Sequence, residues 1–233
     1  MGIFTFTGGG GGGAACVCVP DPYVYWDGTS TSAQIGTNSF SLADLDTTEG
    51  KFDSNCLEFG SSGTHRPALL QTPIDLAAPG YSWSFYFKSK RSGSDWGSLL
   101  KKAGTGASAA HYPIITENTT DELGVYTGGT FTSSGYDMTI WEGSTDWVHI
   151  AVSASTTTGK SRFFINGAFV GEANAIITGQ SVGEIGGYDG TDDQVFSEFL
   201  DEIAYWNLPL SDAQIEKIYN ENRKISAFVP LNW

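Results

Sequence analysis

The carboxylates near the C-terminus are the side chains whose spacing comes nearest to acid–base chemistry. Hydrolysis of a glycosidic bond needs two carboxyl groups that flank the bond, about 5–10 Å apart. Asp201 and Glu202 are neighbours, so on a strand their side chains point to opposite faces. Glu198 and Glu202 share a face, but four residues along a strand separate them too widely for a retaining pair. An inverting separation is within reach, yet we interpret the pair as accidental and predict no catalytic residue and no enzyme.

Other catalytic constellations are absent from the sequence. The three histidines are scattered, and no Gly-x-Ser-x-Gly motif is present to hold a serine nucleophile. The glycine run at residues 8–13 lacks the Gly-Lys-Ser/Thr ending of a phosphate-binding loop. Three cysteines form no even disulfide framework, which predicts free thiols in a reducing compartment.

Aromatic side chains in predicted loops are candidates for sugar binding, because an exposed ring can stack on the face of a sugar. Amide and carboxylate groups beside such rings would hydrogen-bond the sugar hydroxyls. The candidate rings are those of Trp96, Tyr112, Tyr136, Trp141 and Tyr188. Packing of the same rings inside the protein is the alternative, and it stays open at this stage.

Composition limits the partners that these groups can have. The chain of 233 residues has 12 Lys and Arg against 26 Asp and Glu, a net charge of −14 at pH 7. No cluster of cations is available to contact a phosphate backbone, which argues against nucleic acid. No apolar run is long enough to span a membrane, so we expect no membrane insertion. The N-terminal residues show neither the cationic nor the apolar segment of a secretion signal.

The elements that must position these residues are mostly strands. Only 16% of the residues are charged, 13% are aromatic and 30 are glycine, a composition that favours an all-β protein. Short runs rich in aromatic and β-branched residues predict strands at residues 83–89, 147–153, 160–165 and 198–207. Asn166-Gly167 predicts a hairpin turn, and the capping box of Ser211 and Gln214 predicts one short helix near the C-terminus.

This pattern predicts one domain, a two-sheet antiparallel jelly-roll β-sandwich over residues 21–222 with the short C-terminal helix. Residues 1–20 differ in composition and are interpreted as a glycine-rich N-terminal arm, with a flexible tail as the alternative. Residues 223–233 form a C-terminal extension. We predict that the arm anchors the protein in an assembly through Ile3, Phe4, Phe6, Gly8 and Gly13.

Four segments occur in an order typical of one family. They are Cys56-Leu57-Glu58-Phe59-Gly60, the strand at 81–88, the hairpin at 147–170, and Ile185-Gly186-Gly187 followed by the strand at 199–207 and its helix. In this order they resemble concanavalin A-like lectin/glucanase domains, especially the laminin G-like and pentraxin branch. The resemblance covers about residues 50–222 and implies a lectin-like sandwich. The same fold serves lectins, hydrolases, adhesion modules and structural domains, so it leaves the function open.

The resemblance also implies calcium (Ca²⁺), because members of the family hold this ion at the sandwich rim or on the concave sheet. Calcium takes about six to eight oxygen ligands. Asp53 and Asn55, which are distant in the sequence from the loop at 189–193, are candidates to add oxygen ligands to the same ion. The alternative is that the acids of the loop are solvated turn formers around Gly190. The main candidate ligands are Asp189, Asp192, Asp193 and Asp201.

We predict that the chain is a non-enzymatic virion structural protein of a bacteriophage, such as a decoration, fibre or tail component. The fold usually works outside cells, whereas the sequence shows no secretion signal, and a virus particle made in the host cytoplasm resolves this conflict. The expected partners are other virion proteins through the arm, a cell-surface glycan, and further copies in a homo-oligomer such as a trimer. A free-standing lectin or adhesin and a glycoside hydrolase are the alternatives.

Overall fold

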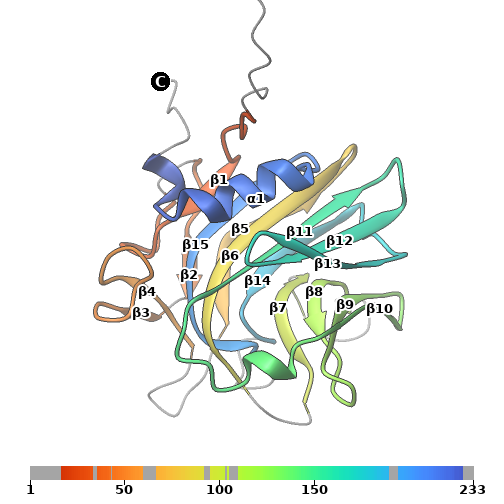
Figure 1. Ribbon diagram of the computed structural model, residues 1–233, viewed down its shortest axis with the longest axis horizontal. Coiled ribbons are helices and arrows are strands. Elements are labelled where there is room, and N and C mark those ends of the chain that lie inside the picture. Colours follow the sequence, from red (N-terminus) through yellow and green to blue (C-terminus); the bar gives the residue numbers. More distant parts are fainter. Residues whose placement is uncertain are drawn as a thin grey trace, which may run out of the picture.

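A computed structural model describes residues 17–33, 36–42, 44–59, 67–91, 95–102, 104, 110–188 and 194–227. Two antiparallel sheets form a sandwich, and one α-helix lies near the C-terminus (Figure 1). This arrangement confirms the predicted all-β jelly-roll. The five candidate anchor residues, Ile3, Phe4, Phe6, Gly8 and Gly13, lie outside the described residues.

The first sheet contains the longest strands. β6 and β15 lie at its centre and pair with each other. The predicted Asn166-Gly167 turn joins β12 to β13, and both turn residues have a positive φ, 49° and 77°. In spatial order the strands are β13 (Ala168–Ala173), β12 (Lys160–Ile165), β11 (Val148–Ser155), β6 (Gly80–Lys90), β15 (Ser197–Trp206), β4 (Cys56–Glu58) and β3 (Asp44–Asp46), and β1 (Val24–Trp26) also pairs with β15.

The second sheet lies on the other side of the core. Its strands, in spatial order, are β10 (Thr130–Asp137), β9 (Glu122–Thr127), β8 (Tyr112–Thr116), β7 (Gly97–Lys102), β14 (Gln180–Ile185), β5 (Ala68–Leu76) and β2 (Phe40–Leu42). Gly128 and Gly129, with φ of 60° and 84°, form the turn between β9 and β10. Two glycines at positive φ match the twist of the strands that they join.

Alternate residues of the central strands fill the core between the sheets. In β6 the inward residues are Tyr81, Trp83, Phe85 and Phe87, and all four are buried. Burial of each such side chain contributes roughly 1.5–3 kcal/mol to folding. Residues between them, such as Ser84 and Tyr86, lie on the outer face of the first sheet.

Helix α1 (Asp212–Glu221) covers part of that outer face, as Figure 1 shows. The predicted capping box is present, because Gln214 N–H donates to Ser211 Oγ and Ser211 N–H donates to Gln214 Oε1. Ile215 and Ile218 pack into a second apolar cluster together with Trp206. Two short 3₁₀ helices, η2 (Thr139–Trp141) and η3 (Ile225–Ala227), complete the elements. No helix in the described part of the chain is long and apolar enough to cross a membrane.

Candidate functional site

Two of the rings that the sequence marked for sugar binding, Trp96 and Tyr112, belong to one aromatic cluster on the second sheet. The Trp96 ring packs edge-to-face on Tyr126 and Phe131, with centroid distances of 5.4 and 5.6 Å. Tyr126 contacts Tyr112 in the same way at 5.7 Å. We call these four residues the Trp96 cluster. None of them belongs to the core between the sheets.

Strand register places three of these rings on the outer face of the second sheet. Tyr126 of β9 pairs with Phe131 of β10 on one side and with Tyr112 of β8 on the other. Cross-strand partners lie on the same face, so the three rings form a row. Gly124 lies beside this row, and a Cβ there would be only 2.6 Å from a ring carbon of Phe131. A larger residue at position 124 would therefore displace the Phe131 ring.

Trp96 separates two hollows, which we together call the Trp96 groove. The smaller hollow, about 140 Å³, is lined mainly by rings of the cluster and by Ile115. The larger hollow, about 350 Å³, is polar, and its lining includes Lys90, Arg91, Asp95, Thr116 and Glu198. Trp96 and Gln194 line both hollows. The groove thus combines an aromatic wall with hydrogen-bonding groups.

Gln194 holds an acceptor next to the aromatic wall. Its Oε1 is buried and receives no hydrogen bond from the described residues. Ser98 lies next to it, since the Ser98 N–H donates to the Gln194 carbonyl at 2.8 Å, and the buried Ser98 Oγ also lacks a partner among the described residues. Buried polar atoms in proteins are almost always hydrogen-bonded.

Charges of both signs face the larger hollow. Lys90 is 4% exposed, and its Nζ lies 2.9 Å from Asp121 and 3.7 Å from Glu142. These two carboxylates compensate the charge of Lys90. Arg91, Asp95 and Glu198 add one positive and two negative groups to the same lining. The hollow therefore offers donors and acceptors without a strong excess of positive charge.

The remaining candidate rings line neither hollow. Trp141 packs partly against the core, and its indole N–H donates to the Tyr136 hydroxyl at 3.1 Å. Tyr188 lies under the ammonium group of Lys101, 4.7 Å from the ring centroid. Lys101 is itself buried and forms an ion pair with Glu184 at 3.0 Å. Packing accounts for the positions of these rings.

The metal prediction rests on four acids, of which the structure describes one. Asp189, Asp192 and Asp193 lie outside the described residues. Asp201 is buried, and its two oxygens accept the backbone N–H groups of Lys51 at 2.8 Å and of Glu202 at 2.7 Å.

A β-bulge corrects two predictions about these acids. The pairing of β15 with β6 shifts between Asp201 and Ala204, and Glu202 has a φ of 52°. The bulge interrupts the alternation of faces, so Asp201 and Glu202 are buried in one polar cluster and do not point to opposite faces. It also separates Glu198 from Glu202, because Glu198 lines the Trp96 groove whereas Glu202 contacts Tyr25 on the helix side. The prediction that Glu198 and Glu202 share a face is wrong for the same reason.

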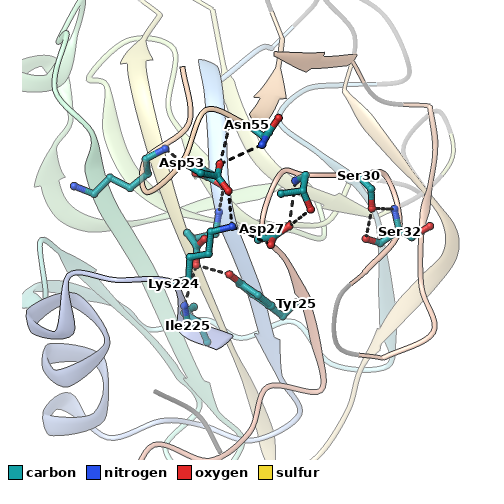
Figure 2. Close-up of polar contacts among 12 residues, drawn as sticks. Tyr25, Asp27, Ser30, Ser32, Asp53, Asn55, Lys224 and Ile225 are labelled. Carbon is teal, nitrogen blue, oxygen red and sulfur yellow. Dashed lines mark hydrogen bonds and ion pairs between the residues drawn. The ribbon is translucent and has the colours of Figure 1, made fainter. Parts of the chain in front are cut away.

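Figure 2 shows this polar cluster, which has Lys224 at its centre. The Lys224 Nζ lies 3.1 Å from Asp27 Oδ2 and 2.5 Å from Asp53 Oδ2. The Tyr25 hydroxyl and the Ile225 N–H both donate to Glu202 Oε2, at 2.6 and 3.0 Å. We call this group the Lys224 cluster, consisting of Tyr25, Asp27, Asp53, Asp201, Glu202 and Lys224.

Burial and charge divide the acids of the Lys224 cluster into two kinds. Burial, reinforced by the charge of Glu202, raises the pKa of Asp201 to about 8. Burial likewise raises the pKa of Glu202 to about 7, although the Tyr25 hydrogen bond opposes the rise. Burial alone would also raise the pKa of Asp53, but hydrogen bonds from Lys224 and Asn55 outweigh it and hold the pKa below its usual value.

The described carboxylates do not fit a calcium ion as they are arranged. No group of three or more His, Cys, Asp or Glu in the described ranges has an arrangement that could hold a metal. The ammonium group of Lys224 provides the positive charge between Asp27 and Asp53. Asp53 Oδ1 accepts the backbone N–H of Asn55 at 2.8 Å, so this oxygen of Asp53 already has a partner. Calcium at loop 189–193 stays a prediction.

Comparison with known proteins identifies the family. A laminin G-like model of the concanavalin A-like lectin/glucanases superfamily matches residues 62–216, more than half of the chain. The chain belongs to this superfamily. Among curated proteins, none matches its sequence significantly.

Solved structures of the concanavalin A-like fold align with the chain at low identity. Domain 4 of an extracellular arabinanase from Geobacillus stearothermophilus, solved in complex with arabinotriose, has a TM-score of 0.62 and 13% identity, over 85% of this chain and 98% of that one. The binding domain of botulinum neurotoxin serotype D has a TM-score of 0.55 and 13% identity, over 86% of this chain and 50% of that one. A pentraxin from Limulus polyphemus has a TM-score of 0.50 and 14% identity, over 70% and 80%. These likenesses show the fold alone.

Sequence reasoning missed several residues of this site, among them Tyr126 and Phe131 of the Trp96 cluster and Gln194 of the groove. Tyr126 and Phe131 flank Gly128-Gly129, and two glycines between alternating residues are a hairpin signal that would have paired these rings. Gln194 gave no such signal, because its position beside Trp96 depends on a loop contact between distant strands.

Proposed function

We propose that the chain is a non-enzymatic virion structural protein that displays a carbohydrate-binding concanavalin A-like sandwich. The observation that carries the carbohydrate-binding part is the Trp96 cluster, a row of rings beside the polar lining of the larger hollow. An aromatic wall with a few placed polar groups is the usual composition of a small-ligand site. The arabinanase domain of the same fold, solved with arabinotriose, adds support that this fold can hold a sugar.

In the proposed complex a sugar ring lies against the Trp96 cluster. Its apolar face covers the rings, and its hydroxyls bond to Asp95, Thr116 or Glu198 in the larger hollow. Edge-to-face packing by Tyr126 and Phe131 holds the Trp96 ring in place before the ligand arrives. This preorganisation lowers the entropic cost of binding.

The virion part of the proposal is supported by the position of the N-terminal segment. Gln214 of α1 donates to the Cys18 carbonyl and Trp206 donates to the Pro20 carbonyl, both at 2.8 Å. Residues 17–20 therefore lie beside the helix, at the end of the sandwich away from the start of β7 (Figure 1). An arm that leaves from this end would hold the protein in a particle while the Trp96 groove faces outward.

Replacement of Trp96 tests the sugar site. Immobilised glycans identify a ligand for the full chain, and calorimetry then measures its affinity. Trp96→Ala should weaken binding about tenfold or more, because it removes the stacking surface. Phe169→Ala is the matched control, since Phe169 is an exposed ring (45%) on β13 that lines neither hollow. Equal affinity of Trp96→Ala and the unchanged protein would contradict the proposal.

The same ligand tests the absence of catalysis. Prolonged incubation with the full chain should release no new reducing ends. Glu198 and Asp95 are the carboxylates of the larger hollow, so hydrolysis that disappears in Glu198→Gln or Asp95→Asn would overturn the non-enzymatic assignment.

A further inference from the structure

A separate hollow lies at the opposite ends of the strands that reach the Trp96 groove. It measures about 630 Å³, and we call it the Tyr23 groove. The larger hollow of the Trp96 groove takes its lining from the end of β6 and the start of β15, whereas the Tyr23 groove takes its lining from the turn before β6 and the end of β15. At about 3.3 Å per residue, the length of β15 places the two grooves roughly 30 Å apart. The main lining residues are Tyr23, Asn38, Thr72, Asp75, Tyr205 and Asn207.

We propose that the Tyr23 groove is a second saccharide site, one that takes neutral sugars. It shares no lining residue with the Trp96 groove, so the two proposed sites can be tested independently. Its volume lies within the range of about 300–1,000 Å³ that small-ligand sites occupy.

Tyr23 provides the stacking surface. It is 60% exposed, although it directly precedes the buried strand β1. Its ring lies perpendicular to that of Tyr205, at 6.0 Å and 86°, so Tyr205 supports it while more than half of Tyr23 stays exposed. The Tyr205 hydroxyl donates to the Asp75 carbonyl at 3.0 Å, which in turn holds Tyr205 against β5.

The loop beside Tyr23 is held in place by contacts within the protein. The Asn38 side chain clamps its loop to β5, because Nδ2 donates to the Thr72 carbonyl at 2.7 Å and Oδ1 accepts the Ser39 N–H at 2.9 Å. Gly36 approaches Tyr23 so closely that a Cβ there would lie 2.8 Å from the Tyr23 carbonyl, and its φ is 84°. A rigid groove loses little entropy when a ligand enters.

The polar groups of the groove determine the class of ligand. The Asp75 carboxylate and the Asn207 amide are exposed and make no hydrogen bond to other described residues, so both can bond ligand hydroxyls. Among the described residues, the lining contains no lysine, arginine or histidine. A carboxylate or phosphate on the ligand would face Asp75 without a compensating cation. An uncharged sugar can stack on the Tyr23 ring and donate hydrogen bonds from its hydroxyl groups to the Asp75 carboxylate.

Nuclear magnetic resonance of the ¹⁵N-labelled full chain tests this site. The probes are neutral oligosaccharides (arabinotriose, cellotriose and maltotriose), with sialyllactose as the anionic comparison. A neutral probe should shift the amides of Gly36, Thr72, Asp75 and Asn207 as it saturates. Tyr23→Ala should raise the midpoint of this titration about tenfold or more, while Tyr23→Phe should retain the binding because it keeps the ring. Sialyllactose should leave these amides unshifted.

Two further variants separate the sites. Trp96→Ala should leave the titration of the Tyr23 groove unchanged, and Phe169→Ala should change neither site. Shifts confined to the amides around Trp96 would support the first site and overturn the second. Sugar-induced shifts at the Tyr23 groove that persist in Tyr23→Ala would also overturn the second site. Shifts that appear there with rising protein concentration and no sugar would overturn it too, because they would indicate that a second copy of the chain occupies the groove.

Discussion

Lys224 provides one positive charge among four carboxylates, and only two of the four contact it. Asp27 and Asp53 hold the ammonium group directly, and hydrogen bonding to both raises the pKa of Lys224 despite its partial burial. Asp201 and Glu202 lie deeper, each 1% exposed, and have only hydrogen bonds to backbone N–H groups and to Tyr25. One cation cannot compensate four carboxylates, of which the two deepest do not contact it. The two deeper acids therefore keep their protons to a higher pH.

These shifts predict that Asp201 and Glu202 make the protein less stable as the pH rises through neutral. The pKa of Asp201 is about 8 and that of Glu202 about 7 in the folded chain, whereas carboxyl groups of an unfolded chain titrate near pH 4. For these two acids the folded state binds more protons than the unfolded state between about pH 4 and pH 8, so their contribution to the free energy of unfolding falls as the pH rises. Burial lowers the pKa of His149 to about 3, which has the opposite effect below about pH 6.5, so the fall is expected chiefly above that pH. Urea unfolding at several pH values measures this fall.

Glu202→Gln should make that pH dependence shallower. The glutamine carbonyl can still accept from the Tyr25 hydroxyl and the Ile225 N–H, and its amide nitrogen would replace Oε1, which has no partner in the described structure. As the pH is raised from about 5 to 8, the free energy of unfolding of the variant should increase by about 1–3 kcal/mol relative to that of the unchanged protein. Glu216→Gln, on the exposed side of α1, is the control and should leave the curve unchanged. Parallel curves for Glu202→Gln and the unchanged protein would contradict the assignment.

At the scale of elements, the β9–β10 hairpin links the fold to the proposed sugar site. Its glycine turn sets Tyr126 opposite Phe131, and both of these rings pack against Trp96. Gly124 makes room for the Phe131 ring, since a Cβ at this position would lie 2.4 Å from the Thr132 carbonyl and 2.6 Å from the ring. The orientation of Trp96 therefore depends on a residue that never touches the ligand.

Gly124→Ala should disturb the groove through this hairpin. The added methyl group must displace backbone or the Phe131 ring, which we expect to cost about 1–3 kcal/mol of stability. Because Trp96 then loses its support, sugar affinity should fall as well, measured by calorimetry on the variant under conditions where it stays folded. Gly128→Asn is the control, since asparagine tolerates a positive φ and position 128 has no heavy atom within 4 Å of its Cβ. Unchanged affinity in Gly124→Ala would show that Trp96 needs no support from Phe131.

Elements with local signals could be predicted from the sequence, and contacts between distant strands could not. The Asn166-Gly167 turn and the Ser211 capping box lie within a few residues of the elements that they set, and both are present. The bulge at Glu202 arises only where β15 pairs with β6, so the alternation of side chains along β15 alone predicted the wrong face for Glu202. The Trp96 cluster likewise joins the residue before β7 to β8, β9 and β10, and no spacing in the sequence encodes that contact.

The whole molecule has two different ends. Helix α1 and the N-terminal residues 17–20 lie together at one end, and the start of β7, which follows Trp96, lies at the other (Figure 1). The Tyr23 groove lies at the same ends of β6 and β15 from which the N-terminal segment enters β1. A particle that holds the chain by its arm would thus present the Trp96 groove outward and keep the Tyr23 groove closer to its own surface.

Removal of the arm tests this polarity. Deletion of residues 1–16 keeps the carbonyl groups of Cys18 and Pro20 that α1 and Trp206 bind, so the sandwich should fold with little change in stability. The truncated chain should retain sugar binding at the Trp96 groove but fail to enter particles, measured by mass spectrometry of particles purified after co-expression with the full set of virion proteins. Phe4→Ser with Phe6→Ser, which removes only the apolar rings of the arm, should give the same failure if these rings are the contact. Incorporation of the truncated chain at the normal level would contradict the anchor, because the sandwich itself would then hold the protein in the particle.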